Sequence, residues 1–332
     1  MITIKKHSPI PKYQQIINCI TYAIDHKLLR KGQPIPSINS LTKEHKLSQD
    51  TVLKAYNQLK ARGIVSSKIG KGYYIASTKL NHQRKIFLLF DRLTSYKELL
   101  YESFLKTLGD SVAVEIFFHH FNKKVFHNLI EDAKGKYTSY VIMPISDKKS
   151  IALVDTLPKN SVFILDQGRS SIGKMYPSVC QNFHKDLYSG LAHGMKFLEK
   201  YERLILVAAD NRKHLKEIIQ SFKNFCLDHD FTGATINSMD SRKVAENEAY
   251  IVINDKDLVY LVKEIERANL ILGKDCGIIS YNDTELKEII AGGITVISTD
   301  FEAMGRRMAE LIINREKVHI HNPSKLIIRN SL

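Results

Sequence analysis

The sequence lacks the features of membrane-spanning, secreted and disulfide-stabilised proteins. No apolar run approaches the ~18–20 residues that a helix needs to cross a bilayer, and residues 1–8 are polar and basic, without the apolar centre of a signal peptide. The four cysteines are far apart and form no CxxC pair, so neither a zinc ribbon nor a disulfide framework is indicated. We therefore expect a cytoplasmic protein with reduced thiols and no membrane contact.

Common catalytic motifs are also missing. The sequence contains no GxSxG elbow, no HExxH, no P-loop, no GxGxxG fingerprint after a strand and no recognisable context for a pyridoxal phosphate lysine. His319 and His321 would share one face of a strand, but no further metal ligand is evident. We expect no catalytic residue, no cofactor and no metal, and keep an α/β enzyme as an alternative.

Acidic residues are scarce in one part of the chain. Residues 1–83 contain fourteen Lys and Arg but three acids, so they carry +11 of the formal net charge of +14, and the remaining 249 residues carry +3. A strongly basic segment on a nearly neutral body indicates a domain that binds a polyanion, because Lys and Arg displace the counterions condensed on phosphates. A merely basic, soluble surface is the alternative.

This basic segment has the pattern of a winged helix-turn-helix. A first amphipathic helix is predicted from Lys12 to about Arg30, followed by a short helix capped by Ser37 and a third helix capped by Ser48. Two β-prone runs within residues 64–75 predict a hairpin with a basic tip, the wing. Such a module puts its third helix into a DNA groove and its wing beside it.

The exposed face of the third helix supplies the best candidates for DNA contact. Gln49 lies at its start, and a Gln amide can both donate to and accept from adenine in the major groove. Nearby lysines and those of the wing tip add attraction for phosphate. The candidate DNA-binding residues are Ser37, Asn39, Ser48, Gln49, Asp50, Thr51, Lys54, Lys68, Gly70 and Lys71. For each of them, a solvated surface role is the alternative.

Residues 84–332 alternate short β-prone runs with helix-length stretches. Continuous apolar strands of this kind indicate parallel sheets covered by helices on both faces, and about 250 residues suit two lobes. The predicted strands are Ile86–Phe90, Val112–Phe118, Tyr140–Met143, Val162–Leu165, Leu204–Ala208, Tyr250–Ile253, Gly277–Ser280 and Thr295–Ser298. We expect an α/β protein with a head in residues 1–76, a linker in 77–83 and a two-lobed, doubly wound body in 84–332.

Polar side chains follow several of these strands, at the position where open parallel sheets bind ligands. Carboxylates and amides there suit the hydroxyl groups of a sugar, because they donate or accept in fixed directions. The candidate effector-binding residues are Asp91, Asp166, Asn254, Asp255 and Asn282. The alternative is that each of them caps a helix or forms a turn.

An ordered set of residues in the head matches a known family. The set is Pro11 to Ile16, Leu28, Gly32, Pro36, Ser37, Leu41, Leu47, Ser48, Thr51, Val52, Ala55, Tyr56, Leu59, Gly63, Ile64, Gly70 and Gly72. It closely resembles the DNA-binding domain of GntR-type bacterial transcription regulators over residues 9–76. Asn39 and Gln49 stand where that family usually has Arg, which leads to the hypothesis of an operator richer in A·T pairs.

A second ordered set runs through the body. It comprises Ser161, Val162, Ile164, Asp166, Val179, Asn182, Arg203, Ile205, Ala249, Ile251, Asn254, Asp255, Asp275, Gly277 to Asp283, Thr295, Val296, Met304, Gly305, Leu326, Arg329 and Ser331. It resembles the effector domains of LacI/GalR-type regulators, which are built like type I periplasmic sugar-binding proteins. The resemblance implies that Asn254 and Asn282 bind effector, although Asn282 stands where Asp is usual.

Together the two resemblances imply a regulator similar to the arabinose-repressor type. Such a protein binds a palindromic operator as a homodimer, and a small molecule in the cleft between the lobes, a sugar or sugar derivative, controls its affinity for DNA. The alternative is a DNA-binding regulator whose body is a dimerisation or interaction module without a ligand.

Overall fold

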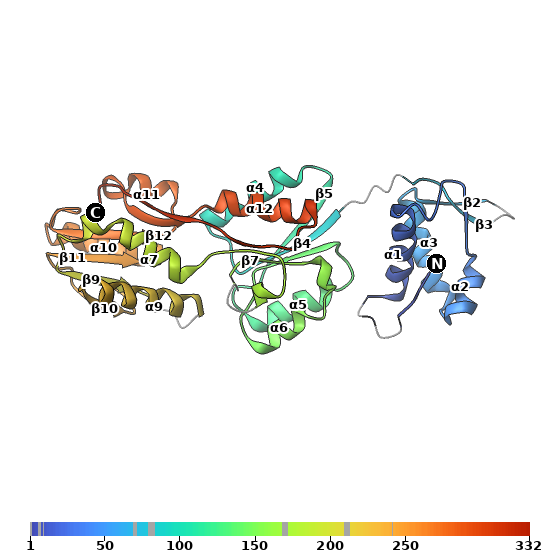
Figure 1. Ribbon diagram of the computed structural model, residues 1–332, viewed down its shortest axis with the longest axis horizontal. Helices are drawn as coiled ribbons and strands as arrows, with labels where there is room; N and C mark the ends of the chain where they lie inside the picture. The colour runs from blue at the N-terminus through green and yellow to red at the C-terminus, as the bar shows by residue number, and fades with distance from the viewer. Residues whose placement is uncertain are drawn as a thin grey trace.

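The computed structural model describes the chain except for residues 1, 6, 7, 9, 69–71, 79–83, 168–171, 209–212 and 241. Figure 1 shows three parts in a row along the longest axis: the head, a middle lobe and a far lobe, here called lobe 1 and lobe 2. Most of the expected linker, residues 79–83, and the wing-tip candidates Gly70 and Lys71 lie outside the described residues.

The head is a winged helix-turn-helix, as its sequence pattern predicts. Its elements are α1 (Lys12–Asp25), β1 (Pro34–Ile35), α2 (Ile38–His45), α3 (Gln49–Ala61), β2 (Val65–Lys68) and β3 (Gly72–Ile75). The strands form an antiparallel sheet in the order β1-β3-β2, and the apolar faces of the three helices form a separate buried core. The first helix is shorter than predicted: it ends at Asp25 rather than near Arg30, because Lys27 takes a left-handed conformation with a φ of 58°.

Lobe 1 is built on a six-stranded parallel sheet in the order β14-β8-β7-β6-β4-β5. Its strands are β4 (Arg84–Phe90), β5 (Val112–Phe118), β6 (Ser139–Ile142), β7 (Val162–Asp166), β8 (Ser178–Cys180) and β14 (His319–His321). Its helices are α4 (Ser95–Leu108), α5 (Lys123–Ala133), α6 (Lys148–Val154) and α12 (Phe301–Asn314), with short helical turns η1 (Lys159–Ser161) and η2 (Ile172–Lys174). Alternate residues of β4 enter two cores: Leu88 packs with α4 and α12, whereas Phe87 packs with α5 and α6.

Lobe 2 has a six-stranded sheet in the order β10-β9-β11-β12-β13-β15, parallel except for β15, which is antiparallel to β13. Its strands are β9 (Arg203–Val207), β10 (Thr232–Ile236), β11 (Glu248–Val252), β12 (Cys276–Tyr281), β13 (Thr295–Thr299) and β15 (Ser324–Ile327). Its helices are α7 (Phe183–His193), α8 (Met195–Leu198), α9 (Lys213–Asp228), α10 (Asp255–Arg267) and α11 (Glu285–Ile289), with the turn η3 (Ile290–Gly292). Helices α7 and α9 share one core with the sheet and α10 shares the other.

All eight predicted strands are present, which confirms the α/β, doubly wound body. Four further strands, β8, β10, β14 and β15, were not predicted. They are three to five residues long, and β10, β14 and β15 consist of exposed and half-buried residues. Short or half-exposed strands do not need the continuous apolar run that marks a strand buried on both faces.

The chain crosses between the lobes three times, at residues 181–182, 300 and 322–323. Asn322 connects the crossings: its backbone N–H donates to the carbonyl of Cys180 at 2.9 Å, and its side-chain Nδ2 donates to the carbonyl of Asp300 at 2.8 Å. The N–H of Asp300 in turn donates to the carbonyl of Pro323 at 3.2 Å. The three segments therefore form one hydrogen-bonded hinge between the lobes.

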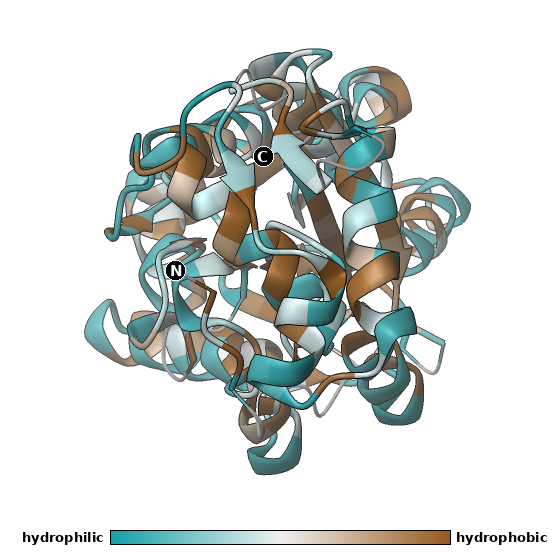
Figure 2. Cartoon of the chain, turned by 90° about the vertical axis from the view of Figure 1, so that its right-hand side faces the viewer, coloured by the Kyte–Doolittle hydropathy of each residue, from teal (hydrophilic) through white to brown (hydrophobic). Residues whose placement is uncertain are grey.

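Hydrophobic residues are concentrated inside the three parts. In the end-on view from the head, the helices carry both hydrophobic and hydrophilic colouring (Figure 2), and the buried hydrophobic residues form one cluster in the head and two in each lobe. The four cysteines are free thiols, with Cys19 half-buried and the other three buried, as expected. Among the helices of the described residues, none has the length and apolar character needed to cross a membrane.

Candidate functional site

Residues from both lobes line a cavity of about 360 Å³ in the cleft between them. It lies at the carboxyl ends of β4, β7, β11 and β12, which is the edge where ligands bind in open parallel sheets. Four of the five candidate effector-binding residues line it: Asp91, Asp166, Asn254 and Asn282. The fifth, Asp255, is not a lining residue, and its exposed carboxylate lies 3.0 Å from Nζ of Lys287.

The cavity contains a buried ion cluster. Lys97 of α4 is 3% exposed, donates to the carboxylate of Asp91 and lies 3.6 Å from Oδ2 of Asp166. Burial lowers the pKa of Lys97, but the two carboxylates more than offset this, so its pKa is raised. Burial also raises the pKa of Asp166, despite the opposing attraction of Lys97. Lys97 thus balances two carboxylates that would otherwise be buried without a counterion.

Two buried amide oxygens in this cavity, Oε1 of Gln181 and Oδ1 of Asn282, have no hydrogen-bond partner within the described residues. The Nε2 of Gln181 donates to Asp166 at 2.5 Å, which fixes the orientation of that amide. Lys287, which is 3% exposed, donates to the carbonyls of Tyr281 and Asn282 at 3.1 and 2.8 Å and so fixes the end of β12. Buried acceptors without partners favour a ligand that donates hydrogen bonds.

The walls of the cavity combine polar and apolar side chains. Aromatic and aliphatic side chains on them are Tyr96, Phe121, Phe183, Leu215, Ile218, Ile253 and Tyr281. Arg92 of lobe 1 and Lys256 of lobe 2 add one cation from each side, and the guanidinium of Arg92 lies 5.4 Å from the ring centroid of Phe121. Apolar surfaces combined with convergent polar groups are typical of small-molecule sites.

Asn254 also caps a helix. Its Oδ1 accepts from the N–H of Asp257 at 2.9 Å, and its Nδ2 donates to the carboxylate of the same residue at 2.5 Å. The capping interpretation that the sequence left open is therefore correct for this residue, although it lines the cavity as well.

Sequence reasoning missed five polar residues that line the cavity, namely Arg92, Lys97, Gln167, Gln181 and Lys256. It also missed Lys287, which fixes the end of β12. Lys97 and Lys287 lie on helices, where a lysine is normally a surface residue. Candidates were selected as the first polar residue after each predicted strand, because ligands bind at the carboxyl ends of parallel strands. This criterion selects Asp91 and does not select Arg92 or Lys97. Gln181 follows β8, a strand too short to be predicted.

In the head, several candidate DNA-binding residues lie at the starts of α2 and α3. Ser37 caps α2 by accepting from the N–H of Ser40 at 3.1 Å. Ser48 caps α3 by accepting from the N–H of Thr51 at 3.3 Å, and the two hydroxyls lie 2.8 Å apart. Both serines are exposed, so the helix starts that they cap are open to a phosphate.

The other candidates lie on the same surface and on the wing. Nε2 of Gln49 donates to Oδ1 of Asn39 at 3.3 Å, and both side chains are exposed, as is Asp50 in the first turn of α3. Lys54 lies 4.4 Å from the ring centroid of Tyr13, and Lys68 lies 5.9 Å from that of Tyr74. Gln49 and Asn39 occupy the two positions at which the GntR-type regulators described above usually have Arg, and this hydrogen bond joins them.

The head matches known regulators in sequence. The model of the bacterial regulatory proteins, gntR family, matches residues 12–75. The HTH-type transcriptional repressor YtrA of Bacillus subtilis is 31% identical over 100 residues, which cover 30% of this chain and 73% of YtrA. The chain belongs to the GntR family of bacterial regulatory proteins.

Another relative of this GntR-family chain is matched over a small part of its own length. YjiR of Escherichia coli, an uncharacterized HTH-type transcriptional regulator, is 32% identical over 68 residues. These residues cover 20% of this chain and 14% of YjiR. The chain therefore spans a small part of that relative's length.

The body of the GntR-family chain matches a different group. The model of a periplasmic binding protein-like domain matches residues 198–332. A periplasmic binding protein/LacI transcriptional regulator from Alkaliphilus metalliredigens, complexed with D-xylulofuranose, superposes with a TM-score of 0.60 at 14% identity, covering 75% of this chain and 98% of its own. A dimeric Lac repressor gives 0.58 at 16% identity, covering 74% and 97%. The body therefore has the LacI-type, periplasmic-binding-protein-like fold.

Proposed function

We propose that this protein is a ligand-responsive transcription regulator that binds a palindromic operator as a homodimer. A sugar or sugar derivative in the cleft between the lobes controls its affinity for DNA. The observation that carries the proposal is the cleft cavity, in which Gln181 and Asn282 each bury an acceptor without a partner among the described residues. A protein with this role acts in the cytoplasm, and we assign it no catalytic residue.

Hydroxyl groups suit this cavity because each can donate one hydrogen bond and accept others. They satisfy the oxygens of Gln181 and Asn282, and they can accept from Arg92 and Lys256 at the two sides. The proposed effector contacts are Asp91, Asp166, Asn254 and Asn282, with Asp255 acting through Lys287. The neighbour from Alkaliphilus metalliredigens is complexed with a sugar, D-xylulofuranose, which supports this ligand class.

Ligand binding and DNA binding are coupled through the hinge. A molecule that contacts both walls of the cleft binds a closed arrangement of the lobes more tightly than an open one, so it shifts the population toward closure. In a dimer, a change in the angle between lobes 1 and 2 alters the spacing of the two heads. Operator affinity then changes with effector concentration, and the operator changes effector affinity by the same factor.

For DNA recognition, we infer that α3 enters the major groove with Gln49 at the base edges. Its amide is exposed at the helix start and hydrogen-bonded to Asn39, which orients it. Ser37, Ser48, Asp50 and Thr51 line the same helix starts. The phosphate-attracting positions are Lys54 and Lys68, together with Gly70 and Lys71, which lie outside the described residues.

Dimer formation is supported by exposed apolar residues along one edge of the body. Leu99 of α4 and Leu286 and Ile289 of α11 are 41%, 65% and 73% exposed. In Figure 1, α4 of lobe 1 and α11 of lobe 2 lie along the same long edge. A two-fold contact along this edge would cover apolar groups of both lobes and would make the interface sensitive to their angle.

The ligand hypothesis is tested by a thermal-shift screen of the full-length protein with monosaccharides and sugar phosphates, followed by operator binding with each hit. We expect a hit to raise the melting temperature and to change operator affinity. Asn282→Ala should remove the shift, whereas Asn269→Ala, an asparagine on lobe 2 that does not line the cleft, should keep it. Intact operator binding without any hit across the panel would favour the alternative, a body that serves dimerisation or interaction alone.

The base contact is tested by selecting preferred operators for the wild type and for Gln49→Ala. We expect the variant to lose about 1–3 kcal/mol at an adenine of the half-site, the range of one bidentate contact. Gln14→Ala removes a half-buried amide from α1, outside the starts of α2 and α3, and should leave operator preference unchanged. A guanine-centred half-site bound equally well by Gln49→Ala would contradict the inference.

A further inference from the structure

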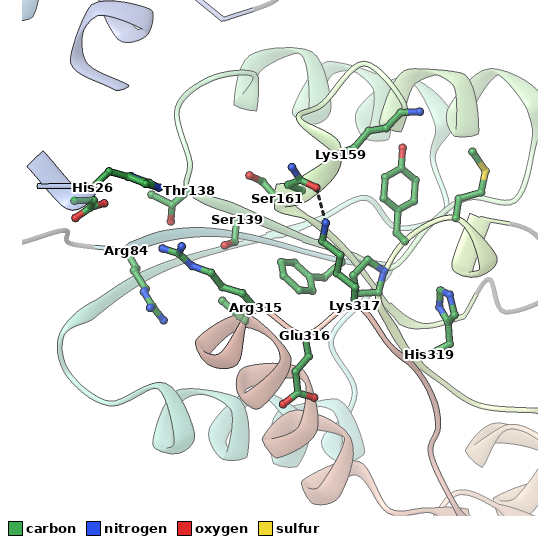
Figure 3. A pocket seen from close by; sticks show the side chains of 17 residues that line it. His26, Arg84, Thr138, Ser139, Lys159, Ser161, Arg315, Glu316, Lys317 and His319 are labelled. Atoms are coloured by element: carbon green, nitrogen blue, oxygen red, sulfur yellow. Dashed lines mark hydrogen bonds between the residues drawn. The ribbon is translucent and has the colours of Figure 1, made fainter. Parts of the chain in front are cut away.

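A second cavity, of about 1090 Å³, lies between the head and lobe 1. On the lobe 1 side, the cavity is lined by residues at the amino ends of the strands. The effector cleft lies at the carboxyl ends, so the two cavities are at opposite edges of the lobe 1 sheet. The head contributes Asp25 and His26 from the end of α1. Figure 3 shows the side chains that line it, drawn from segments far apart in the sequence.

The lobe 1 wall of this cavity is strongly basic. Arg84, Lys159, Arg315 and Lys317 line it, and within the described part of the chain none of these four cations lies within ion-pair distance of a carboxylate. Nζ of Lys317 donates to the neutral side chain of Asn160 at 3.1 Å. These cations come from β4, η1 and the turn between α12 and β14, so folding brings together charges that repel one another.

The acidic residue of the same wall does not neutralise this charge. The carboxylate of Glu316 accepts from Asn314 at 2.9 Å. Figure 3 shows it directed away from the side chains of Arg315 and Lys317. Residues 84–332 carry +3 in total, so four cations on one wall are a concentration of charge and not a general property of the body.

The head and lobe 1 approach each other closely at the start of α1. A Cβ on Gly135 of lobe 1 would lie 2.8 Å from Cδ of Pro11 in the head, and Gly135 has a φ of 73°, which favours glycine. To the lining of the cavity the head contributes one carboxylate, Asp25, and one imidazole, His26. The four cations of lobe 1 therefore outnumber the two carboxylates of the lining, Asp25 and Glu316, and an anion in the cavity would reduce the repulsion among the cations.

We propose that this cavity binds a small, phosphate-bearing molecule with at least two negative charges. Arginine forks and lysine ammonium groups are the side chains that recognise phosphate oxygens. Figure 1 shows α1 on the side of the head nearer to lobe 1, with α2 and the wing strands beyond it, so the cavity faces away from the proposed DNA-binding surface. A cavity of this size and position suits a small ligand rather than a duplex.

The site gives the head a second input that is independent of the effector cleft. An anion that contacts Arg315 and Lys317 on lobe 1 and His26 on the head binds the docked head more tightly than an undocked one. It therefore shifts the population of head positions, and by linkage it alters operator affinity. This coupling passes through the cavity itself and needs no signal through the linker.

The test is a calorimetric titration of inorganic pyrophosphate into the full-length protein at fixed ionic strength. We expect binding by the wild type and at least a tenfold loss of affinity in the double variant Arg315→Gln/Lys317→Gln. The matched control Lys223→Gln/Lys325→Gln removes two charges from exposed positions of lobe 2 and should bind pyrophosphate as the wild type does. Equal affinities in the two double variants, or no binding by the wild type, would overturn the site.

Amide hydrogen exchange tests the part played by the head. We expect pyrophosphate to slow exchange at residues 22–28 in the wild type and not in Arg315→Gln/Lys317→Gln. Binding without this protection would overturn the bridging role. A different result would assign the two cations to DNA phosphates instead. In that case the wild type would fail to bind pyrophosphate. The double variant would lose operator affinity, and the slope of the logarithm of its operator affinity against the logarithm of salt concentration would be smaller by about two.

Discussion

Lys97 shows how much a single residue determines in the effector cleft. It is almost fully buried, and its ammonium group lies between the carboxylates of Asp91 and Asp166. Gln181 joins this cluster through Asp166, so one lysine orients groups contributed by lobe 1 and by the hinge. The charge of the cluster, and not its hydrophobic surroundings, fixes where the polar atoms of the site lie.

Replacing this lysine should destabilise the body strongly. In Lys97→Met the two carboxylates are buried without a counterion, and we expect a loss of about 3–5 kcal/mol in the free energy of unfolding at neutral pH, measured by urea denaturation. Lys256→Met, at the exposed side of the same cavity, should change stability by less than about 0.5 kcal/mol. Equal losses in the two variants would contradict the assigned role of Lys97.

The pH dependence of that variant has a definite sign. Burial raises the pKa of Asp166 above its ordinary value, so the folded state takes up a proton more readily than the unfolded state does. Without Lys97 this pKa rises further. The stability deficit of Lys97→Met should therefore be largest at neutral pH and should shrink as the pH falls through the folded-state pKa, as urea titrations at several pH values would show.

At the scale of elements, the pairing of α4 with α12 joins segments about 200 residues apart in sequence. The two helices approach closely at Gly305, where an added Cβ would lie 2.2 Å from the carbonyl oxygen of Leu100. Glycine is unfavourable inside a helix by about 1 kcal/mol relative to alanine. Its presence in α12 is explained by the helix contact, which leaves no room for a side chain.

In Gly305→Ala, helix propensity and packing are expected to change the stability in opposite directions. Propensity alone predicts stabilisation by about 1 kcal/mol, whereas forcing a methyl group against the backbone of α4 costs about 1–3 kcal/mol. We expect packing to dominate and the melting temperature, measured by calorimetry, to fall. Arg306→Ala, at the next and exposed position of α12, should leave it nearly unchanged. A higher melting temperature for Gly305→Ala would show that the helices can separate without cost.

Elements could be predicted from sequence where burial on both faces leaves a continuous apolar run. All of β7, β11 and β13 is buried, and each was predicted to within two residues at either end. β10 and β14 escaped prediction because their residues are exposed or half-buried and join the sheet through backbone hydrogen bonds. Such pairing depends on a neighbouring strand that is distant in sequence.

The residues of the cleft also divide into those that the sequence predicts and those that depend on contacts between distant segments. Asp91, Asp166, Asn254 and Asn282 were predicted because they come directly after strands, and strand ends meet at one edge of a parallel sheet. Lys97 could not be predicted, because its burial is the result of contacts with segments that fold beside it. The basic cavity next to the head was missed for the same reason, since its cations are scattered through the sequence.

At the scale of the whole molecule, three parts of different charge and chemistry lie in one row (Figure 1). The strongly basic head is at one end, and the effector cleft lies between the two lobes that follow. Exposed apolar residues lie on α4 and on α11, which belong to the two different lobes that form that cleft. In the proposed dimer, an interface that includes both helices would be altered by any change in the lobe angle, and effector binding would then be linked to dimer geometry.

The proposed interface predicts a change in oligomeric state. Leu286→Asp/Ile289→Asp places two charges on the exposed apolar surface of α11, and we expect the dimer to dissociate at micromolar concentration, as measured by light scattering after size-exclusion chromatography. Val259→Asp, which charges an exposed apolar position on α10, should remain dimeric. A dimer that persists in the α11 variant would place the interface elsewhere.

Because the chain crosses between the lobes three times, the head and the two lobes are completed at different times during translation. Lobe 1 needs β14 and lobe 2 needs β15, and both strands lie after residue 318. The head, with its own separate core, emerges from the ribosome first. At about 5–20 residues per second, it is available for ten seconds or more before either sheet is complete. A nascent chain therefore contains its complete DNA-binding module before its ligand-binding body is complete. The sheets of the two lobes are then completed within a few residues of each other, by β14 and β15.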